Sequence, residues 1–130
     1  MKNNVFFLVC IALFLSLYAC DDNNETFQEQ QAELNAFAQE IEAMARVSRC
    51  DGVSQCRSIA FGSKPCGGPW SYLVYSASIN TDRLEQMVRS YNAREKAFNI
   101  QWNLVSDCEM VLPPTRIECV ENECVPVYED

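Results

Sequence analysis

The chain has 130 residues, of which 48% are hydrophobic, and this length leaves room for one domain. It contains no histidine, so the usual general base of hydrolases and the commonest zinc ligand are both missing, and an enzyme is disfavoured. Ten Lys and Arg against 18 Asp and Glu give a formal charge of −8, which disfavours nucleic acid as a partner because phosphates repel such a surface.

Residues 1–19 predict a signal peptide. Lys2 precedes an apolar run over residues 5–17 that is too short for a comfortable membrane span. The run ends at Leu17-Tyr18-Ala19-Cys20, which resembles the lipobox of bacterial lipoproteins, in which a small residue precedes a cysteine that becomes lipidated. The resemblance implies cleavage before Cys20 and stable anchoring in a membrane by acyl chains. The alternative is a plain secretory signal with incidental cysteines.

Residues 20–26 predict a lipidated Cys20 followed by an acidic, flexible tether. The acids Asp21 and Asp22 resemble the export signal that sends lipoproteins of the Bacteroidota to the outside of the outer membrane. In other bacteria an Asp at this place favours retention in the inner membrane. A third reading is that these acids only keep the linker solvated.

The first half of the mature chain predicts a helix followed by two strands. Apolar residues recur at three- and four-residue steps from Phe27 to about Ser48, as in an amphipathic helix. Residues 57–61 alternate like a half-buried strand, and residues 62–69 are dense in turn formers. Residues 70–76 are aromatic and β-branched, so we expect a loop and then a second strand.

The second half predicts another helix and further strands. Asn80 or Thr81 can cap a helix that runs to about Phe98 and carries its apolar residues on one face. Residues 101–106 alternate again and predict a strand, and residues 111–112 extend the pairing.

A hairpin is expected at the end of the chain, with residues 117–120 and 125–128 on either side of Glu121-Asn122. The short links favour antiparallel neighbours. We therefore expect one disulfide-stabilised α+β domain over residues 27–130, with two helices packed on an antiparallel sheet of about four to five strands.

The cysteines predict disulfides. Six remain in the mature domain: Cys50, Cys56, Cys66, Cys108, Cys119 and Cys124. Six cysteines allow 15 connectivities. If Glu121-Asn122 is a two-residue turn, Cys119 lies opposite Cys124 at a non-hydrogen-bonded pair, where a cross-strand bridge is reasonable. Their spacing, without histidine, does not suit zinc, and there is no Cys-x-x-Cys for redox work, so we expect no metal and no cofactor.

Two turn-rich segments beside cysteines are candidate binding loops. In residues 62–69, Lys64 precedes Pro65 and Cys66; the alternative is a strand connection whose glycines supply positive φ. In residues 111–119, paired prolines hold the backbone extended ahead of Arg116. The candidate inhibitory residues are Pro114, Thr115, Arg116 and Ile117, with Lys64 in reserve.

Arg116 on a cysteine-braced, extended segment suits the carboxylate-based specificity pocket of a trypsin-like protease. Inhibition follows if the braces keep a nicked chain in place, because religation then competes with release. Thr115-Arg116-Ile117 beside Cys119 also resembles the reactive site of plant Bowman–Birk inhibitors. The alternative is an arginine at the edge of a hairpin strand.

Small cysteine-containing lipoproteins of the Bacteroidota resemble this chain in the lipobox, the tether, residues 61–76, Ser106-Asp107-Cys108 and Glu118-Cys119-Val120. Potempins, which are protease-inhibitor lipoproteins of similar size and anchoring, are similar in architecture. The resemblance implies a cell-envelope protein in the outer membrane, displayed at the cell surface, that inhibits a serine protease. The alternative is a non-enzymatic envelope interaction or ligand-capture module.

Overall fold

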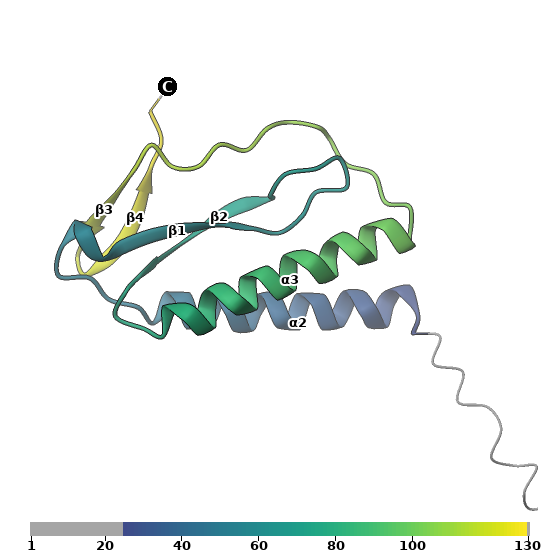
Figure 1. Ribbon diagram of the computed structural model, residues 1–130, viewed down its shortest axis with the longest axis horizontal. Helices are drawn as coiled ribbons and strands as arrows, with labels where there is room; N and C mark the ends of the chain where they lie inside the picture. The colour runs from purple at the N-terminus through teal and green to yellow at the C-terminus, as the bar shows by residue number, and fades with distance from the viewer. Residues whose placement is uncertain (1–24, 130) are drawn as a thin grey trace, which may run out of the picture.

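A computed structural model of the chain describes residues 25–129, apart from the side chain of Ser54 (Figure 1). The predicted signal peptide, the lipidation site Cys20 and most of the tether lie outside the described residues. The described chain is α+β, as predicted. Its elements are α2 (Phe27–Arg46), the 3₁₀ helix η1 (Val53–Gln55), β1 (Cys56–Phe61), β2 (Ser71–Ser76), α3 (Thr81–Gln101), β3 (Arg116–Val120) and β4 (Glu123–Val127).

Helix α2 begins at Phe27, as predicted, because Thr26 and Glu29 form a capping box. The Glu29 amide donates to Thr26 Oγ1, and the Thr26 amide donates to Glu29 Oε2 at 2.8 Å. These hydrogen bonds hold the pKa of Glu29 below its ordinary value. Neither helix in the described part of the chain has the length and apolar character needed to cross a membrane.

Helix α3 is capped by Asn80, whose Oδ1 accepts from the Arg83 amide at 3.0 Å, and it runs past Phe98 to Gln101. It ends in a Schellman motif in which Asn103 has φ +49° and the Leu104 amide donates to the Asn99 carbonyl at 3.0 Å. The predicted strand over residues 101–106 is therefore wrong, because its first residues complete and cap this helix.

The strands form two separate antiparallel pairs, β1–β2 and β3–β4, and the expected single sheet of four to five strands is wrong. The closing hairpin is confirmed: Glu121 and Asn122 have φ of +50° and +68°, which suits a tight two-residue turn, and Cys119 lies opposite Cys124. The predicted extension through residues 111–112 is also wrong, since residues 102–115 contain neither helix nor strand.

The helices lie side by side beneath β1 and β2 (Figure 1). The buried side chains between these layers are apolar or aromatic: Ile41, Ala45, Phe61, Tyr75, Leu84, Val88 and Tyr91. At the far end of the helices, the Phe27 ring packs 5.1 Å from Phe98 and 5.4 Å from Trp102, measured between ring centroids. Both helices therefore offer one rigid support to the β1–β2 hairpin.

Three disulfides connect residues 50–66 to the last part of the chain: Cys50–Cys119, Cys56–Cys124 and Cys66–Cys108. The six predicted disulfide cysteines are thus all paired, but the predicted Cys119–Cys124 bridge is wrong. Cys119 bonds to Cys50, which lies between α2 and η1, and Cys124 bonds to Cys56, the first residue of β1. An isolated two-stranded hairpin is marginal in water. The first two bridges, together with a 2.9 Å hydrogen bond from the Cys50 amide to the Asn122 carbonyl, hold β3–β4 in place.

Candidate functional site

The long connection between α3 and β3, residues 102–115, is the most unusual part of the fold, and we call it the crossing segment. Figure 1 shows it drawn out along the length of the molecule, on the side of β1 and β2 away from the helices. Most connections in compact domains have about 4–6 residues, and a longer one without regular structure is commonly functional.

The crossing segment rests on the β1–β2 loop, residues 62–69, which α3 holds through two asparagine side chains that lie two turns apart. Asn92 accepts from the Gly62 amide at 2.8 Å and donates to the Ala60 carbonyl at 3.0 Å. Asn99 donates to the Ser63 carbonyl at 2.7 Å. Because a rigid helix anchors its backbone at successive positions, the loop is a fixed base.

Lys64 joins this base to the crossing segment. Its ammonium donates to Asp107 Oδ1 at 2.8 Å and to the Glu109 carbonyl at 3.0 Å, and it lies 5.2 Å from the centroid of the Trp70 ring. Lys64 is only 7% exposed. The predicted role of Lys64 as the reserve residue for a protease pocket would require breaking all of these contacts, which disfavours that role.

Further contacts position the beginning of the crossing segment. Cys108 is bonded to Cys66, whose amide donates to Ser106 Oγ at 3.3 Å. Asp107 also accepts from the Glu109 amide at 3.2 Å. The hydrogen bond from Lys64, followed by that from the Glu109 amide, holds the pKa of Asp107 below its ordinary value, so this carboxylate stays charged at neutral pH.

Beyond Glu109 the crossing segment changes character and presents apolar side chains to solvent. Met110 is 79% exposed and Leu112 is 63% exposed, and upstream Val105 is 92% exposed. Within the described part of the chain, the backbone amides and carbonyls of residues 110–114 form no hydrogen bonds. Free backbone groups beside exposed apolar side chains are what a partner needs in order to add a strand.

The other end of the crossing segment is fixed as well. The Thr115 amide donates to the Val127 carbonyl at 2.9 Å, and Thr115 Oγ1 accepts from the Glu129 amide at 3.3 Å. Pro113 and the half-buried Pro114 restrict the backbone just before this anchor. Residues 110–113, which are exposed apart from the half-buried Val111, therefore form a short stretch between two held ends, which we call the exposed stretch.

Arg116 lies in β3, paired opposite Val127, and not in the exposed stretch. Its guanidinium contacts Glu118 at 3.0 Å and also pairs with Glu129. Ile117 is half-buried opposite Pro126. Entry of Arg116 into a protease pocket would require two changes. Separation from both carboxylates costs little free energy, because the ion pairs are exposed. Unpairing of β3 costs more, because it breaks backbone hydrogen bonds of the hairpin.

The Sγ atoms of Cys50, Cys56 and Cys124 lie within 4.8 Å of one another. This closeness arises because the Cys50–Cys119 and Cys56–Cys124 bridges are neighbours. Zinc binds thiolates, and sulfurs that are already joined in disulfides do not supply them. The cluster is therefore a pair of adjacent bridges.

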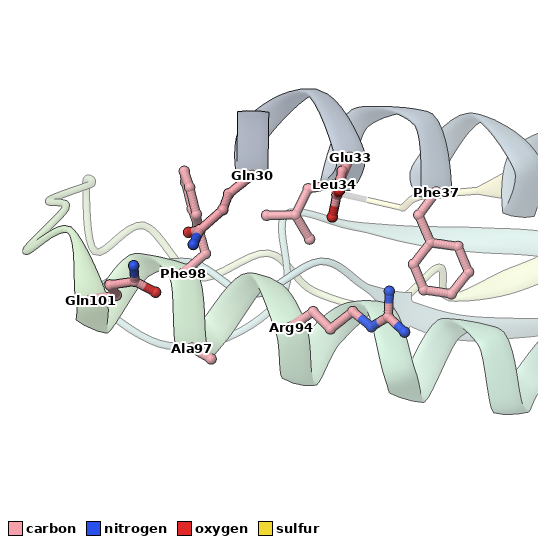
Figure 2. Close-up of a pocket in the computed structure, with 8 residues that line it drawn as sticks. All are labelled: Gln30, Glu33, Leu34, Phe37, Arg94, Ala97, Phe98 and Gln101. Carbon is pink, nitrogen blue, oxygen red and sulfur yellow. The ribbon is translucent and has the colours of Figure 1, made fainter. Parts of the chain in front are cut away.

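A second feature is a groove of about 200 Å³ between the helices, on one flank of the domain. Figure 2 shows Leu34 and Phe37 of α2 directed toward Arg94 of α3, and Ala97 of α3 also lines the groove. The Arg94 guanidinium lies 5.0 Å from the centroid of the Phe37 ring. Glu33 also lines the groove. Among the described residues Arg94 has no ion-pair partner, so its charge faces an apolar wall and solvent.

The sequence indicated the cysteine-braced region, but it predicted no functional role for Asp107, Glu109 or Met110. Residues 111–112 had instead suggested strand pairing, because apolar and β-branched residues read as strand. The available signal was Asn103, a common residue at a left-handed helix end, which would have left residues 104–115 as a long connection. Comparisons with protein-family models, curated proteins and solved structures found no match for this chain.

Proposed function

We propose that this protein is a lipid-anchored inhibitor of serine proteases that presents the crossing segment as a substrate-like strand. The observation that carries the proposal is the exposed stretch over residues 110–113, which has free backbone groups and apolar side chains between two fixed ends. A protease binds its substrate as an added strand, and a segment already held in shape loses little conformational entropy on binding.

The disulfide pattern supports inhibition over simple cleavage. A cut within residues 110–113 leaves the downstream piece attached through Cys119 to Cys50 and through Cys124 to Cys56. The upstream piece is held close to the cut by Cys66–Cys108 and by Lys64. Because the new ends remain together, resynthesis of the peptide bond competes with release of the product.

The anchoring part of the proposal rests on Cys20 and the lipobox-like residues before it. The described domain begins a few residues later with the capping box at Thr26, so acyl chains on Cys20 would hold it close to a membrane surface. A Cys20→Ala variant should take up no labelled fatty acid and should leave the membrane fraction, whereas retention of both label and membrane association would contradict lipidation at this residue.

The experiment is a titration of the oxidised full-length protein, purified in mild detergent, against serine proteases with apolar, basic and small specificity pockets. We expect stoichiometric inhibition of at least one class, and loss of inhibition after reduction of the disulfides. A matched double variant, Cys66→Ser with Cys108→Ser, should weaken inhibition while leaving the other two bridges intact. If no protease of the panel is inhibited, the proposal is wrong.

The helix groove favours a second candidate function, capture of a small amphipathic carboxylate. Arg94 offers a cation at one side of an apolar wall formed by Leu34, Phe37 and Phe98. A carboxylate would pair with the guanidinium while a short apolar tail covers Leu34 and Phe98. This function would operate in an envelope binding module without protease activity.

Octanoate is a suitable probe for this second function, because it combines a carboxylate with a short apolar chain. Calorimetric titration should show binding to the parent protein and a roughly tenfold or greater loss with Arg94→Gln. The exposed Arg83→Gln on the same helix is the matched control. Absence of heat with the parent protein would remove the groove from consideration.

A further inference from the structure

We infer that Met110 is the residue that enters the specificity pocket, and that the target is therefore a serine protease with a large apolar pocket. This inference rests on the proposed function and specifies its partner. It moves the reactive bond from Arg116–Ile117 to Met110–Val111.

The backbone groups of the crossing segment support this assignment. In an extended chain, the amide and carbonyl of one residue point to one side, and those of the next residue point to the other. The Glu109 amide donates to Asp107, two residues earlier in the same segment, and the Glu109 carbonyl accepts from Lys64 of the β1–β2 loop, so the Glu109 carbonyl is directed toward that loop. Counted from Glu109, the alternation of an extended chain assigns the backbone groups of Cys108, Met110 and Leu112 to the opposite side. Within the described chain the backbone groups of these residues, and of Val111, form no hydrogen bonds.

Among these three residues, only Met110 is free of chemical and steric obstacles to reaction. The side chain of Cys108 is occupied by its bridge to Cys66. The bond after Leu112 leads into Pro113, whose ring nitrogen has no hydrogen and whose ring crowds the leaving side. Met110 has neither obstacle, its side chain is 79% exposed, and its unbranched thioether adapts to an apolar pocket.

The chemistry balances with groups that a serine protease supplies. Its serine oxygen bonds to the Met110 carbonyl carbon, and the Met110–Val111 bond breaks. The serine proton passes through the protease's base to the Val111 nitrogen, which leaves as an amine. The reverse step takes the proton back and restores the peptide bond, and the held ends favour it.

The contrast with Arg116 is geometric. Its guanidinium is engaged by Glu118 and Glu129, and its backbone belongs to the β3–β4 ladder. Met110 needs no unpairing of strands before it can bind. A protease with an apolar pocket can therefore bind Met110 without rearrangement of the fold. A trypsin-like protease could bind Arg116 only after the β3–β4 hairpin opens.

Three variants of the full-length oxidised protein test this inference. Met110→Ala should weaken inhibition of proteases with large apolar pockets by about 100-fold, since a central buried side chain carries much of an interface's affinity. Met110→Lys should transfer inhibition to trypsin-like proteases, because their pocket carboxylate would pair with the new ammonium. Arg116→Ala, the matched control, should change inhibition of either protease class by no more than about twofold.

Mapping of the nicked chain gives an independent readout. After long incubation with the protease, we expect a fragment that begins at Val111 and separates only after reduction, because Cys119 and Cys124 hold it. Since Met110 is exposed, its variants should melt like the parent. If Met110→Ala inhibits as well as the parent, or the nick falls at Arg116–Ile117, this inference is wrong while inhibition stands. If the parent inhibits nothing, the proposed function itself fails.

Discussion

The ammonium of the nearly buried Lys64 lies 2.8 Å from Asp107 Oδ1, across 43 residues of sequence, and joins the β1–β2 loop to the crossing segment. The same ammonium also binds the Glu109 carbonyl at 3.0 Å. One cation thus fixes Asp107 and Glu109, the residues on either side of Cys108. The exposed stretch depends on this contact for its position.

Replacing Asp107 by Asn should change how stability depends on pH. The folded-state pKa of Asp107 is lowered by Lys64, so its contribution is fully present above the ordinary aspartate pKa of about 3.9 and is lost as pH falls through the lower folded value. Urea unfolding from about pH 6 to about pH 2 should therefore show a shallower acid decline for Asp107→Asn than for the parent. Parallel curves would show that the Lys64 contact contributes nothing to folding.

The losses in free energy of unfolding caused by removing the two neighbouring disulfides should not add. Cys50–Cys119 and Cys56–Cys124 close nearly the same loop, with separations of 69 and 68 residues. When either remains, the other closes only a short additional loop, so its loss as a double Cys→Ser variant should cost about 3 kcal/mol, while loss of both should cost about 7 kcal/mol. Denaturant unfolding measures these values, and a cost for both that equals the sum of the two would contradict the shared-loop explanation.

A single Cys119→Ser variant should scramble its disulfides. It leaves the Cys50 thiol within 4.8 Å of both sulfurs of the Cys56–Cys124 bridge. Attack by the Cys50 thiolate on Cys124 releases the Cys56 thiolate, and attack on Cys56 releases Cys124. Peptide mapping at mildly alkaline pH should find new pairs that include Cys50. The matched variant Cys50→Ser with Cys119→Ser lacks the free thiol and should keep Cys56–Cys124 unchanged.

Gly62 should tolerate alanine much less well than Gly68. Their φ values of +84° and +80° impose nearly the same backbone cost, about 1 kcal/mol, on any L residue. A Cβ on Gly62 would also lie 2.6 Å from Trp70 Cδ1, whereas a Cβ on Gly68 meets nothing. We expect Gly62→Ala to cost about 2–4 kcal/mol and Gly68→Ala about 1 kcal/mol in thermal unfolding. Equal costs would show that Trp70 moves aside freely.

Tyr75 should ionise at a higher pH than an ordinary tyrosine, and its ionisation should destabilise the fold. Burial, and then its hydrogen bond to Glu85, raise the pKa of Tyr75 to about 12. Its contribution to stability is complete below the unfolded pKa of about 10 and is lost as pH rises through the folded value. Tyr75→Phe should cost about 1 kcal/mol at neutral pH and make the alkaline decline shallower. Tyrosinate absorbance checks the titration, and an ordinary pKa would contradict this account.

Features set by neighbouring residues could be predicted from the sequence. The apolar steps after Phe27 indicated α2, Asn80 indicated the start of α3, and the two-residue turn at Glu121-Asn122 placed Cys119 opposite Cys124. Each depends on contacts within a few positions along the chain. The same local reasoning failed at residues 101–106, where an alternating pattern lies in a helix end, because alternation over six residues cannot distinguish a strand from a cap.

The candidate site depends on contacts between distant residues, which the sequence alone did not predict. The prolines and cysteines indicated a braced region near Arg116, but local sequence contains no information about where Arg116 would find carboxylates or what would hold Glu109. Glu129 closes on Arg116 only because β4 returns beside β3, and Lys64 reaches Glu109 only because the β1–β2 loop lies beneath the crossing segment. These contacts join positions far apart in sequence.

The sequence by itself determined the helix and turn positions, the α+β class and the oxidised state expected of six cysteines, because propensity, capping and composition act locally. Only the tertiary structure decided which cysteines pair, that the strands form two hairpins, and that Met110 is exposed while Lys64 is buried. The physical reason is that a disulfide, a buried charge or a free backbone group depends on which distant segment lies within a few ångströms, and packing of the whole chain sets that distance.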